Sequence, residues 1–405
     1  MRYSRMAQSA LHFFRGTAII QARDLADSPA SGPTVQLCGD CHLSNFGAFA
    51  TPERSLVFDI NDFDETFPGP WEWDVKRLVA SFVVAARYRG FSSNRAESAA
   101  RSAIRSYRMR MSAYASLGVL EMWYEQIRVD DLMAYFKDDS AFLQRLTRAR
   151  KKALSRTSEA VFPKLTTVIN GRVQIVDDPP LIYHFQQGME GFEKWRAAIF
   201  KNYLKSLSAD RRQLFERFRF QDNAIKVVGV GSVGTRRFVS LLLAGDTDPL
   251  LLQIKEARRS VLEPSDGPSR FENQGERVVT GQRLMQSASD IFLGWATLGK
   301  HDVYARQLRD MKVSAEIEST DAEALEAYAE ICGWALARAH AKAGDAATIS
   351  GYLGSNAQID DAMVRYAVAY ADQVDSDFAE FQSAIRSGRL KTEADVRPSA
   401  LDLGL

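Results

Sequence analysis

The sequence predicts an α+β protein with two lobes, one mainly helical and the other built on a small antiparallel sheet. Two helix-rich regions, 1–160 and 313–405, carry apolar residues at helical spacing. The region 218–312 between them is rich in short β-branched and apolar runs separated by turn residues. A strand-rich block between helix-rich blocks is typical of α+β architecture. Residues 161–217 are expected to connect the first helical region to the sheet through a hairpin and a helix.

The first helix-rich region should contain several helices around one extended stretch. Gly90 and the Phe-Ser-Ser that follows it mark the end of one helix and the N-cap of the next. The expected helices cover 6–26, 74–117 with this break, and 119–160, while buried strand pieces cover 35–37 and 56–58.

The other elements follow in order along the chain. The run KLTTVINGRVQIV alternates in polarity and contains Asn170-Gly171, a sequence typical of a tight hairpin turn. The expected elements are a hairpin within 163–186, a helix over 190–218, strands in IKVVGVGSVGTRRFVSLLLAG and LLLQIKEA, a helix over 271–288, strands in IFLGWATL and DVYARQL, helices over 321–342 and 359–387, and a loose tail after 392.

Composition excludes several classes of function. The net charge is +1, so no overall field attracts nucleic acid or an anionic membrane. No run reaches about 18 apolar residues, which argues against a membrane span, and the N-terminus lacks the features of a signal peptide. Three cysteines, an odd number, favour a reducing compartment. We therefore expect a cytoplasmic protein, and the sequence indicates no partner protein.

Polar residues concentrate in the stretch 35–78, between short apolar runs. Carboxylates at the ends of buried strands are costly unless a positive charge compensates them. Mg²⁺ prefers hard oxygen ligands of this kind, although acids that cap turns and pair with arginines are the alternative. The polar set comprises Asp40, His42, Asn45, Asp59, Asp62, Asp64, Glu65 and Asp74.

The segment Cys38-Gly-Asp-Cys41-His42 also matches the C-x-x-C-H attachment pattern of c-type haem. Attachment of haem would require export from the cytoplasm, and the sequence shows no export signal. The haem interpretation is therefore not favoured.

A glycine-rich segment lies in the strand-rich region: Gly229, Gly231 and Gly234 form a G-x-G-x-x-G that also contains Ser232. A dinucleotide-binding loop must open into a helix, but here an apolar, β-branched strand follows. A glycine loop between two strands is the protein-kinase arrangement, in which the loop covers nucleotide phosphates. A simple tight turn is the alternative.

Lys255 ends the next apolar strand, in the position of the kinase lysine that contacts the α- and β-phosphates. Burying an unpaired ammonium is expensive, so a partner is expected. Glu276, 276 − 255 = 21 residues further on in the following helix, is the predicted partner, with Glu272 as the alternative.

With these motifs together, the chain resembles the protein-kinase-like superfamily and, within it, the aminoglycoside and choline phosphotransferases. Residues 38–45 match their H-G-D-x-H-x-x-N loop, and 61–65 followed by 69–75 match their metal motif. More specifically, the chain resembles the bacterial DUF2252 family over roughly residues 3–390. The motifs of that family are F-x-R-G at 13–16, GD-x-HL-x-NFG, NDFDE, and R-Q-L-R-D-M-K at 306–312.

The resemblance implies a two-lobed, protein-kinase-like fold that is circularly permuted, because the catalytic loop precedes the glycine loop and the lysine. The order of the motifs along the chain is free to change, since the site is a cleft between two lobes. Two residues depart from the pattern: Cys38 stands where many relatives have histidine, and Cys41 stands where most have a small residue.

The resemblance also implies roles for single residues. Asp40 would be the catalytic carboxylate, and Asn45, Asp62 and Asp64 would hold Mg²⁺, with Asp59 as another possible ligand. Lys255, fixed by Glu276, would grip the phosphates of ATP under the glycine loop. Asp74 would anchor the backbone of the catalytic loop, and Arg15 and Arg306 are candidate anion contacts, each of which could equally form a structural salt bridge.

The implied function is ATP- and Mg²⁺-dependent phosphoryl transfer to an unidentified hydroxyl of a small molecule or a protein. Two alternatives keep the nucleotide site: a nucleotide-binding pseudokinase and a transferase of AMP. A phosphohydrolase built on the carboxylates alone would leave the glycine loop and Lys255 unexplained.

Overall fold

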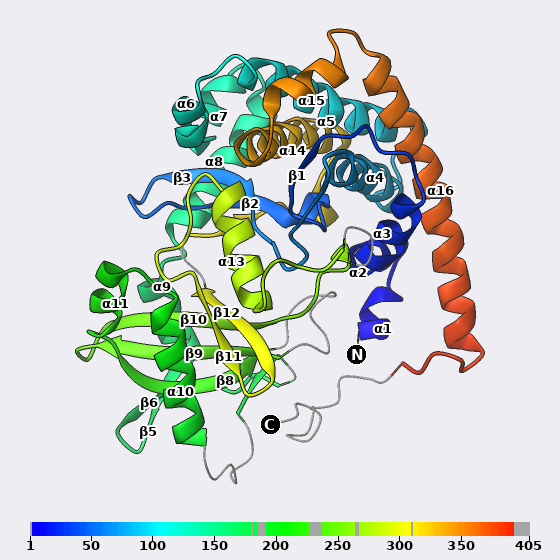
Figure 1. Cartoon of the computed structure of the whole chain (residues 1–405). Helices are drawn as coiled ribbons and strands as arrows, with labels where there is room; N and C mark the ends of the chain where they lie inside the picture. The colour runs from blue at the N-terminus through cyan, green and yellow to red at the C-terminus, as the bar shows by residue number, and fades with distance from the viewer. Residues whose placement is uncertain are drawn as a thin grey trace.

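The protein is described by a computed structural model in which residues 2–179, 181–184, 192–226, 236–263, 267–308 and 311–392 are defined, the side chains of 192–198 excepted. Helices dominate one part and antiparallel strands the other, which confirms the predicted α+β class (Figure 1). Helices from the first and last thirds of the chain lie side by side in the upper half of Figure 1. The six-stranded sheet lies below them.

The largest sheet has the strand order β11-β12-β10-β9-β8-β7, and every neighbouring pair is antiparallel. The strand β7 comes from the connecting region and adds a short edge to the sheet. The bounds are β7 (Ile182–Tyr183), β8 (Arg219–Lys226), β9 (Arg237–Ala244), β10 (Asp248–Ala257), β11 (Gly294–Leu298) and β12 (His301–Gln307).

Both faces of this sheet are covered, so its central strands β9 and β10 contain continuous apolar runs rather than alternating patterns. On β10, Leu250 and Leu252 belong to one apolar cluster, and Leu251 between them belongs to the cluster on the opposite face. The first cluster includes Tyr203 from α10 (Phe192–Lys205) and Phe215 from α11 (Ala209–Phe215). The second is closed by Val161 from α9 (Ser158–Leu165). The helix α13 (Gln274–Met285) connects β10 to β11.

The predicted hairpin at Asn170-Gly171 is confirmed. It joins β5 (Thr166–Ile169) to β6 (Arg172–Ile175), and both turn residues have positive φ, 51° and 74°. Two positive φ values are the geometry of a type I′ turn, which Asn-Gly adopts readily.

In the helical part, α14 (Ala322–Ala343) packs closely on α5 (Ser93–Tyr114). A Cβ at Gly333 would lie 2.1 Å from the carbonyl oxygen of Ala103, so the two helix backbones meet where only glycine fits. The predicted break at Gly90 is confirmed, since α4 (Glu72–Tyr88) ends there and Ser92 caps α5. The other C-terminal helices are α15 (Ala346–Leu353) and α16 (Gln358–Arg386).

Three predicted helices are divided, and the one expected over 190–218 consists of α10 and α11. The helix expected over 6–26 is three helices, because Ser9 caps a new start and the Thr17 hydroxyl bonds to the carbonyl of Phe13. The region 119–160 likewise holds separate helices and not one. The bounds are α1 (Arg2–Met6), α2 (Ala10–Gly16), α3 (Ala18–Ala26), α6 (Val119–Tyr124), α7 (Val129–Tyr135) and α8 (Ser140–Leu154), followed by α9.

Small strands between the helices and the large sheet carry the polar stretch. The pair β1 (Thr34–Leu37) and β4 (Phe67–Pro70) is antiparallel, and β2 (Phe46–Ala50) pairs with β3 (Leu56–Ile60) and with β13 (Val313–Ser314). The short helices η1 (Leu43–Asn45) and η2 (Ile317–Ser319) lie at the edges of this region. No helix within the described residues is both long and apolar enough to span a lipid bilayer.

Candidate active site

A polar cavity of about 310 Å³ opens where the N-terminal helices, the polar stretch and the large sheet meet. This volume is in the range of small-molecule sites in proteins. The structure brings together there five residues that the sequence analysis selected from distant segments: Asp40, Asn45, Asp62, Asp64 and Lys255.

Asp74, on α4, anchors the backbone of the loop that follows β1 through two hydrogen bonds. Its Oδ2 accepts a hydrogen bond from the Cys38 amide at 2.8 Å, and its Oδ1 accepts one from the Gly39 amide at 3.0 Å. Gly39 has φ +86°, and a Cβ there would lie 2.2 Å from the carbonyl oxygen of Glu65. The geometry agrees with the anchoring role expected for Asp74, and it turns Asp40 toward the cavity.

The carboxylate of Asp40 is held on one side. Arg77, from α4, donates a hydrogen bond from Nε to Oδ1 at 3.0 Å, and its Nη2 forms an ion pair with the same oxygen at 2.9 Å. His42 Nε2 lies 3.7 Å from Oδ2. Burial lowers the pKa of His42 to about 4, so the imidazole is neutral. Because its Nδ1 accepts from the Ser44 amide, the ring proton is on Nε2 and faces Asp40.

Asn45 and Asp62 supply further oxygen atoms to the cavity. Asn45 Nδ2 donates to the backbone oxygen of Asp40 at 2.8 Å, so the amide oxygen is the group left for a ligand. Burial would raise the pKa of Asp62, but the charges of Lys255, Arg306 and Arg237 outweigh it and keep the carboxylate ionised. An ionised carboxylate and an amide oxygen fit the ligand chemistry of Mg²⁺.

Lys255 reaches this region from β10 and is 1% exposed. Its Nζ lies 2.6 Å from Oδ2 of Asp64, 2.7 Å from Oδ1 of Asp64, and 3.6 Å from Oδ1 of Asp62. Burial lowers the pKa of Lys255, while both carboxylates oppose the shift. Tyr304, on the neighbouring strand β12, also donates a hydrogen bond to Asp64. The pair therefore connects the large sheet directly to the polar stretch.

The expected partner of Lys255 was Glu276, and the structure differs. Within the described residues no ion pair joins Lys255 to Glu276 or to Glu272. The inward residue of α13 is Arg277, which is 1% exposed and donates to the carbonyls of Asp64 at 2.9 Å and Arg258 at 2.8 Å. Asp64 occupies the position that Glu276 was expected to take.

Asp59 is also separate from the cavity. It is fully buried, and its Oδ1 and Oδ2 lie 2.7 and 2.9 Å from Nη2 of Arg338 on α14. Ser287 donates two further hydrogen bonds to Oδ2. With its oxygens occupied in the core, Asp59 connects β3 to α14 and does not line the cavity.

The glycine-rich residues Gly229, Gly231, Ser232 and Gly234 lie outside the described residues. The strands on either side, β8 and β9, are antiparallel neighbours, so this segment joins adjacent strands of the large sheet. That connection is the one expected from the sequence.

Several residues of the cavity were missed or left undecided by the sequence analysis. Arg15 and Arg306, the candidate anion contacts, both line it, and so do Arg237 and Gln253. Arg77 was not selected, although its position three residues after Asp74 places both on the same face of α4. This spacing is the signal that could have identified it.

A larger cavity, about 400 Å³, lies on the other side of β2 and β3. Its lining is mainly apolar and includes Phe58, Leu132 and Tyr328, and it contains none of the predicted site residues. The smaller cavity is therefore the candidate active site.

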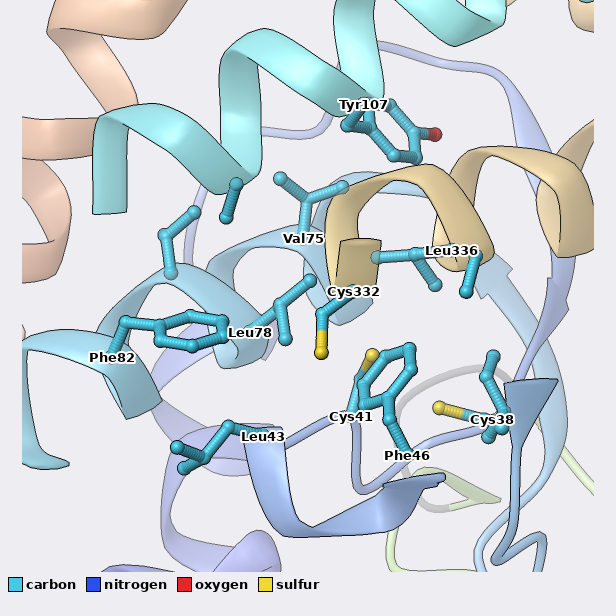
Figure 2. Close-up of a cluster of buried hydrophobic side chains, with 14 of the residues drawn as sticks. Cys38, Cys41, Leu43, Phe46, Val75, Leu78, Phe82, Tyr107, Cys332 and Leu336 are labelled. Atoms are coloured by element: carbon cyan, nitrogen blue, oxygen red, sulfur yellow. The ribbon is translucent and has the colours of Figure 1, made fainter. Parts of the chain in front are cut away.

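Cys38 and Cys41 belong to the loop itself, and their side chains lie with that of Cys332 from α14 in the apolar core (Figure 2). Burial raises the pKa of Cys41 to about 11, so its thiol is protonated. Cys38, Cys41 and Asp74 are close enough to share a cation. However, Asp74 already accepts the two loop amides and faces His340 Nε2 at 3.3 Å. We interpret the cysteines as core packing that supports the loop.

Comparison with known proteins adds one finding. The family described as "Uncharacterized protein conserved in bacteria (DUF2252)" matches residues 1–384. Searches of the curated proteins and of the solved structures returned no significant match. Since the match includes both the helical regions and the large sheet, the chain belongs to the DUF2252 family.

Proposed function

We propose that the protein is an ATP- and Mg²⁺-dependent phosphotransferase with a permuted, two-lobed, kinase-like architecture. The observation that carries the proposal is the cavity in which Lys255, Asp62 and Asp40 meet, although 255 − 40 = 215 residues separate the first from the last. Phosphoryl transfer requires positioned charges rather than covalent chemistry, and this cavity supplies charges of both signs.

The order of elements around Lys255 supports a kinase-like site. In protein kinases a glycine-rich loop covers the phosphates, and the lysine lies on the third strand of the sheet, before a helix. Here β8, the glycine-rich connection, β9 and β10 follow in that order, and α13 comes next. The loop with Asp40 and Asn45 and the segment with Asp62 come earlier in the chain, as a circular permutation requires.

Each residue of the cavity has a part in the proposed reaction. Oδ2 of Asp40, the oxygen that Arg77 does not hold, would orient the acceptor hydroxyl and take its proton. Lys255 would bind phosphate oxygens of ATP, and Asn45, Asp62 and Asp64 would hold Mg²⁺. When bound, the cation supplies positive charge against the phosphates. A phosphate would replace Asp64 as the partner of Lys255, which frees that carboxylate for the metal.

The test measures binding and transfer separately on the full chain. Thermal unfolding with increasing ATP and Mg²⁺ should show a rising midpoint, because a ligand that binds only the native state stabilises it. Asp62→Asn should weaken the Mg²⁺-dependent part of the shift, and Lys255→Ala the phosphate-dependent part. A wild-type midpoint that does not change with ATP and Mg²⁺ would contradict the proposal.

Transfer is followed with ATP labelled on the γ-phosphate, using hydrolysis or self-modification when no acceptor is added. Asp40→Asn should retain ATP binding and lose about 10²- to 10⁴-fold in rate, as expected for loss of a general base. The exposed Asp27→Asn is the matched control and should react at the wild-type rate. A parallel assay uses ATP labelled on the α-phosphate, and transfer of this label without transfer of the γ label would identify an AMP transferase. Binding without transfer of either label would identify a pseudokinase.

A further inference from the structure

Arg15, the last basic residue of α2, is a largely buried cation without a partner among the residues that the structure describes. It lines the cavity, and its Nε is buried with no hydrogen-bond acceptor. Its guanidinium makes no hydrogen bond or ion pair with any other residue in the described part of the chain. Burying a guanidinium without a counter-ion or a hydrogen-bond acceptor costs desolvation free energy, so Arg15 destabilises the folded protein as it stands.

Two other buried arginines of the same region have several hydrogen-bond acceptors that compensate the burial of their charge. Arg77 donates to Asp40, to Gln21 Oε1 at 3.0 Å and to the carbonyl of Phe14 at 2.6 Å. Arg277 donates to three backbone carbonyls and to a glutamine side chain. Only a group from outside the described residues can do the same for Arg15.

The neighbours of Arg15 indicate which part of the cavity it serves. The acidic groups whose charges act on it are Asp40 and Glu318, both beyond ion-pair distance. The cations of the large sheet, Lys255 and Arg306, act instead on Asp62, where the metal and phosphates are proposed to bind. Arg15 therefore belongs to the half of the cavity that contains the catalytic carboxylate.

A second cation adds positive charge to the half of the cavity that contains Asp40 and Arg15. Arg2, from α1, also lines the cavity, and its Nη2 donates to the carbonyl oxygen of Gly16 at 2.9 Å. That bond uses one donor of a planar group with five, so Arg2 can approach the same ligand as Arg15. Paired guanidinium groups in a cavity fit a phosphate or a carboxylate.

We propose that Arg15 binds an anionic group of the acceptor, a phosphate or a carboxylate, and so places a hydroxyl of that acceptor at Asp40. The proposal rests on the phosphotransferase function above. In the reaction the hydroxyl oxygen bonds to the γ-phosphorus, the bond from that phosphorus to the β–γ bridging oxygen breaks, ADP leaves, and the hydroxyl proton passes to Asp40. The resemblance to choline and aminoglycoside phosphotransferases would suggest cationic acceptors, whereas Arg15 predicts an anionic one.

The test uses four probes that carry a hydroxyl but differ in charge: glycerol 3-phosphate, glycerate, glycerol and choline. Calorimetric titration of the free protein should detect glycerol 3-phosphate or glycerate, and the comparison of these two distinguishes phosphate from carboxylate. Arg15→Gln should weaken binding of the preferred anion about 10- to 100-fold, the loss of a charge-assisted hydrogen bond. Arg15→Lys should recover part of it, and Arg23→Gln on the exposed face of α3 should change nothing.

Folding is tested in the same variants. Removing an uncompensated buried charge should leave the free energy of unfolding in urea unchanged or higher, so Arg15→Gln should fold. A clear loss of stability in Arg15→Gln would show that Arg15 has a structural partner and would overturn the proposal.

Other outcomes separate this inference from the proposed function. If glycerol and choline bind as well as the anions, if no probe binds, or if Arg15→Gln weakens ATP with Mg²⁺ rather than the anion, Arg15 does not recognise the acceptor. If the anion binds through Arg15 but the wild-type protein shows no affinity for ATP, the anion site stands and the phosphotransferase function fails.

Discussion

The ion pair between Lys255 and Asp64 is one of the contacts that join the large sheet to the polar stretch, and its strength can be measured. Breaking a buried pair by removing one partner usually costs about 3–5 kcal/mol, because a buried charge is left alone. Asp64 is 30% exposed and Asp62 remains 3.6 Å from the ammonium, so part of the compensation persists. For Asp64→Asn we therefore expect a loss of about 2–3 kcal/mol in the free energy of unfolding.

Urea unfolding of a double-mutant cycle measures the pair itself. Asp64→Asn leaves the Lys255 ammonium without its main counter-ion, and Lys255→Met removes that ammonium. The double variant should therefore be more stable than the sum of the two single changes predicts. Glu276→Gln is the matched control on α13 and should stay within about 0.5 kcal/mol of wild type, because Glu276 is partly exposed and its side chain has no hydrogen bond or ion pair within the described residues.

Two results would refute this reasoning. Additive effects in the cycle would mean that Lys255 and Asp64 do not interact in solution. A loss for Glu276→Gln as large as that for Asp64→Asn would mean that Glu276, the partner expected from the kinase pattern, holds the lysine after all.

Two further predictions concern the groups around the cavity. Asp59→Asn should lower the free energy of unfolding in urea by about 3–5 kcal/mol, because it leaves the fully buried Arg338 without its counter-ion; a loss below about 1 kcal/mol would contradict this. His42 should make stability fall as the pH drops from 6.5 toward 4, because the unfolded chain binds the proton there and the folded site does not. The difference of 6.5 − 4 = 2.5 units corresponds to at most about 3 kcal/mol, and His42→Gln should lack this part of the pH dependence. Parallel pH profiles for wild type and variant would be the contrary result.

Local patterns in the sequence predicted those elements whose geometry depends on a few adjacent residues. The Asn170-Gly171 turn and the helix break at Gly90 are of this kind. The helix expected over 6–26 failed for a related reason: the apolar spacing continues through it, but Ser9 and Thr17 offer the backbone competing hydrogen bonds. Periodicity alone does not register such side-chain bonds.

The meeting of Lys255 with Asp62 could be predicted only because both belong to known motifs, since no local pattern relates residues 255 − 62 = 193 positions apart. The partner of Lys255 could not be predicted. Neighbouring residues on a helix point about 100° apart, so the rotation of α13 about its own axis decides whether Glu276 or Arg277 faces inward. The apolar residues of that helix do not fix the rotation closely enough.

The N-terminal helices are part of the candidate site, which the motif F-x-R-G by itself does not reveal. Arg77 bonds to Asp40 and also to the carbonyl of Phe14, and its guanidinium lies 3.8 Å from the centre of the Phe14 ring. The same turn of α2 that receives Arg77 therefore directs Arg15 into the cavity. Arg77 has its partners in Asp40 and α2, and Arg15, the residue after Phe14, is the one proposed to contact the ligand. In Figure 1 these helices lie beside α4 and α16, so the last long helix of the chain packs against the elements that carry Arg15 and Arg77.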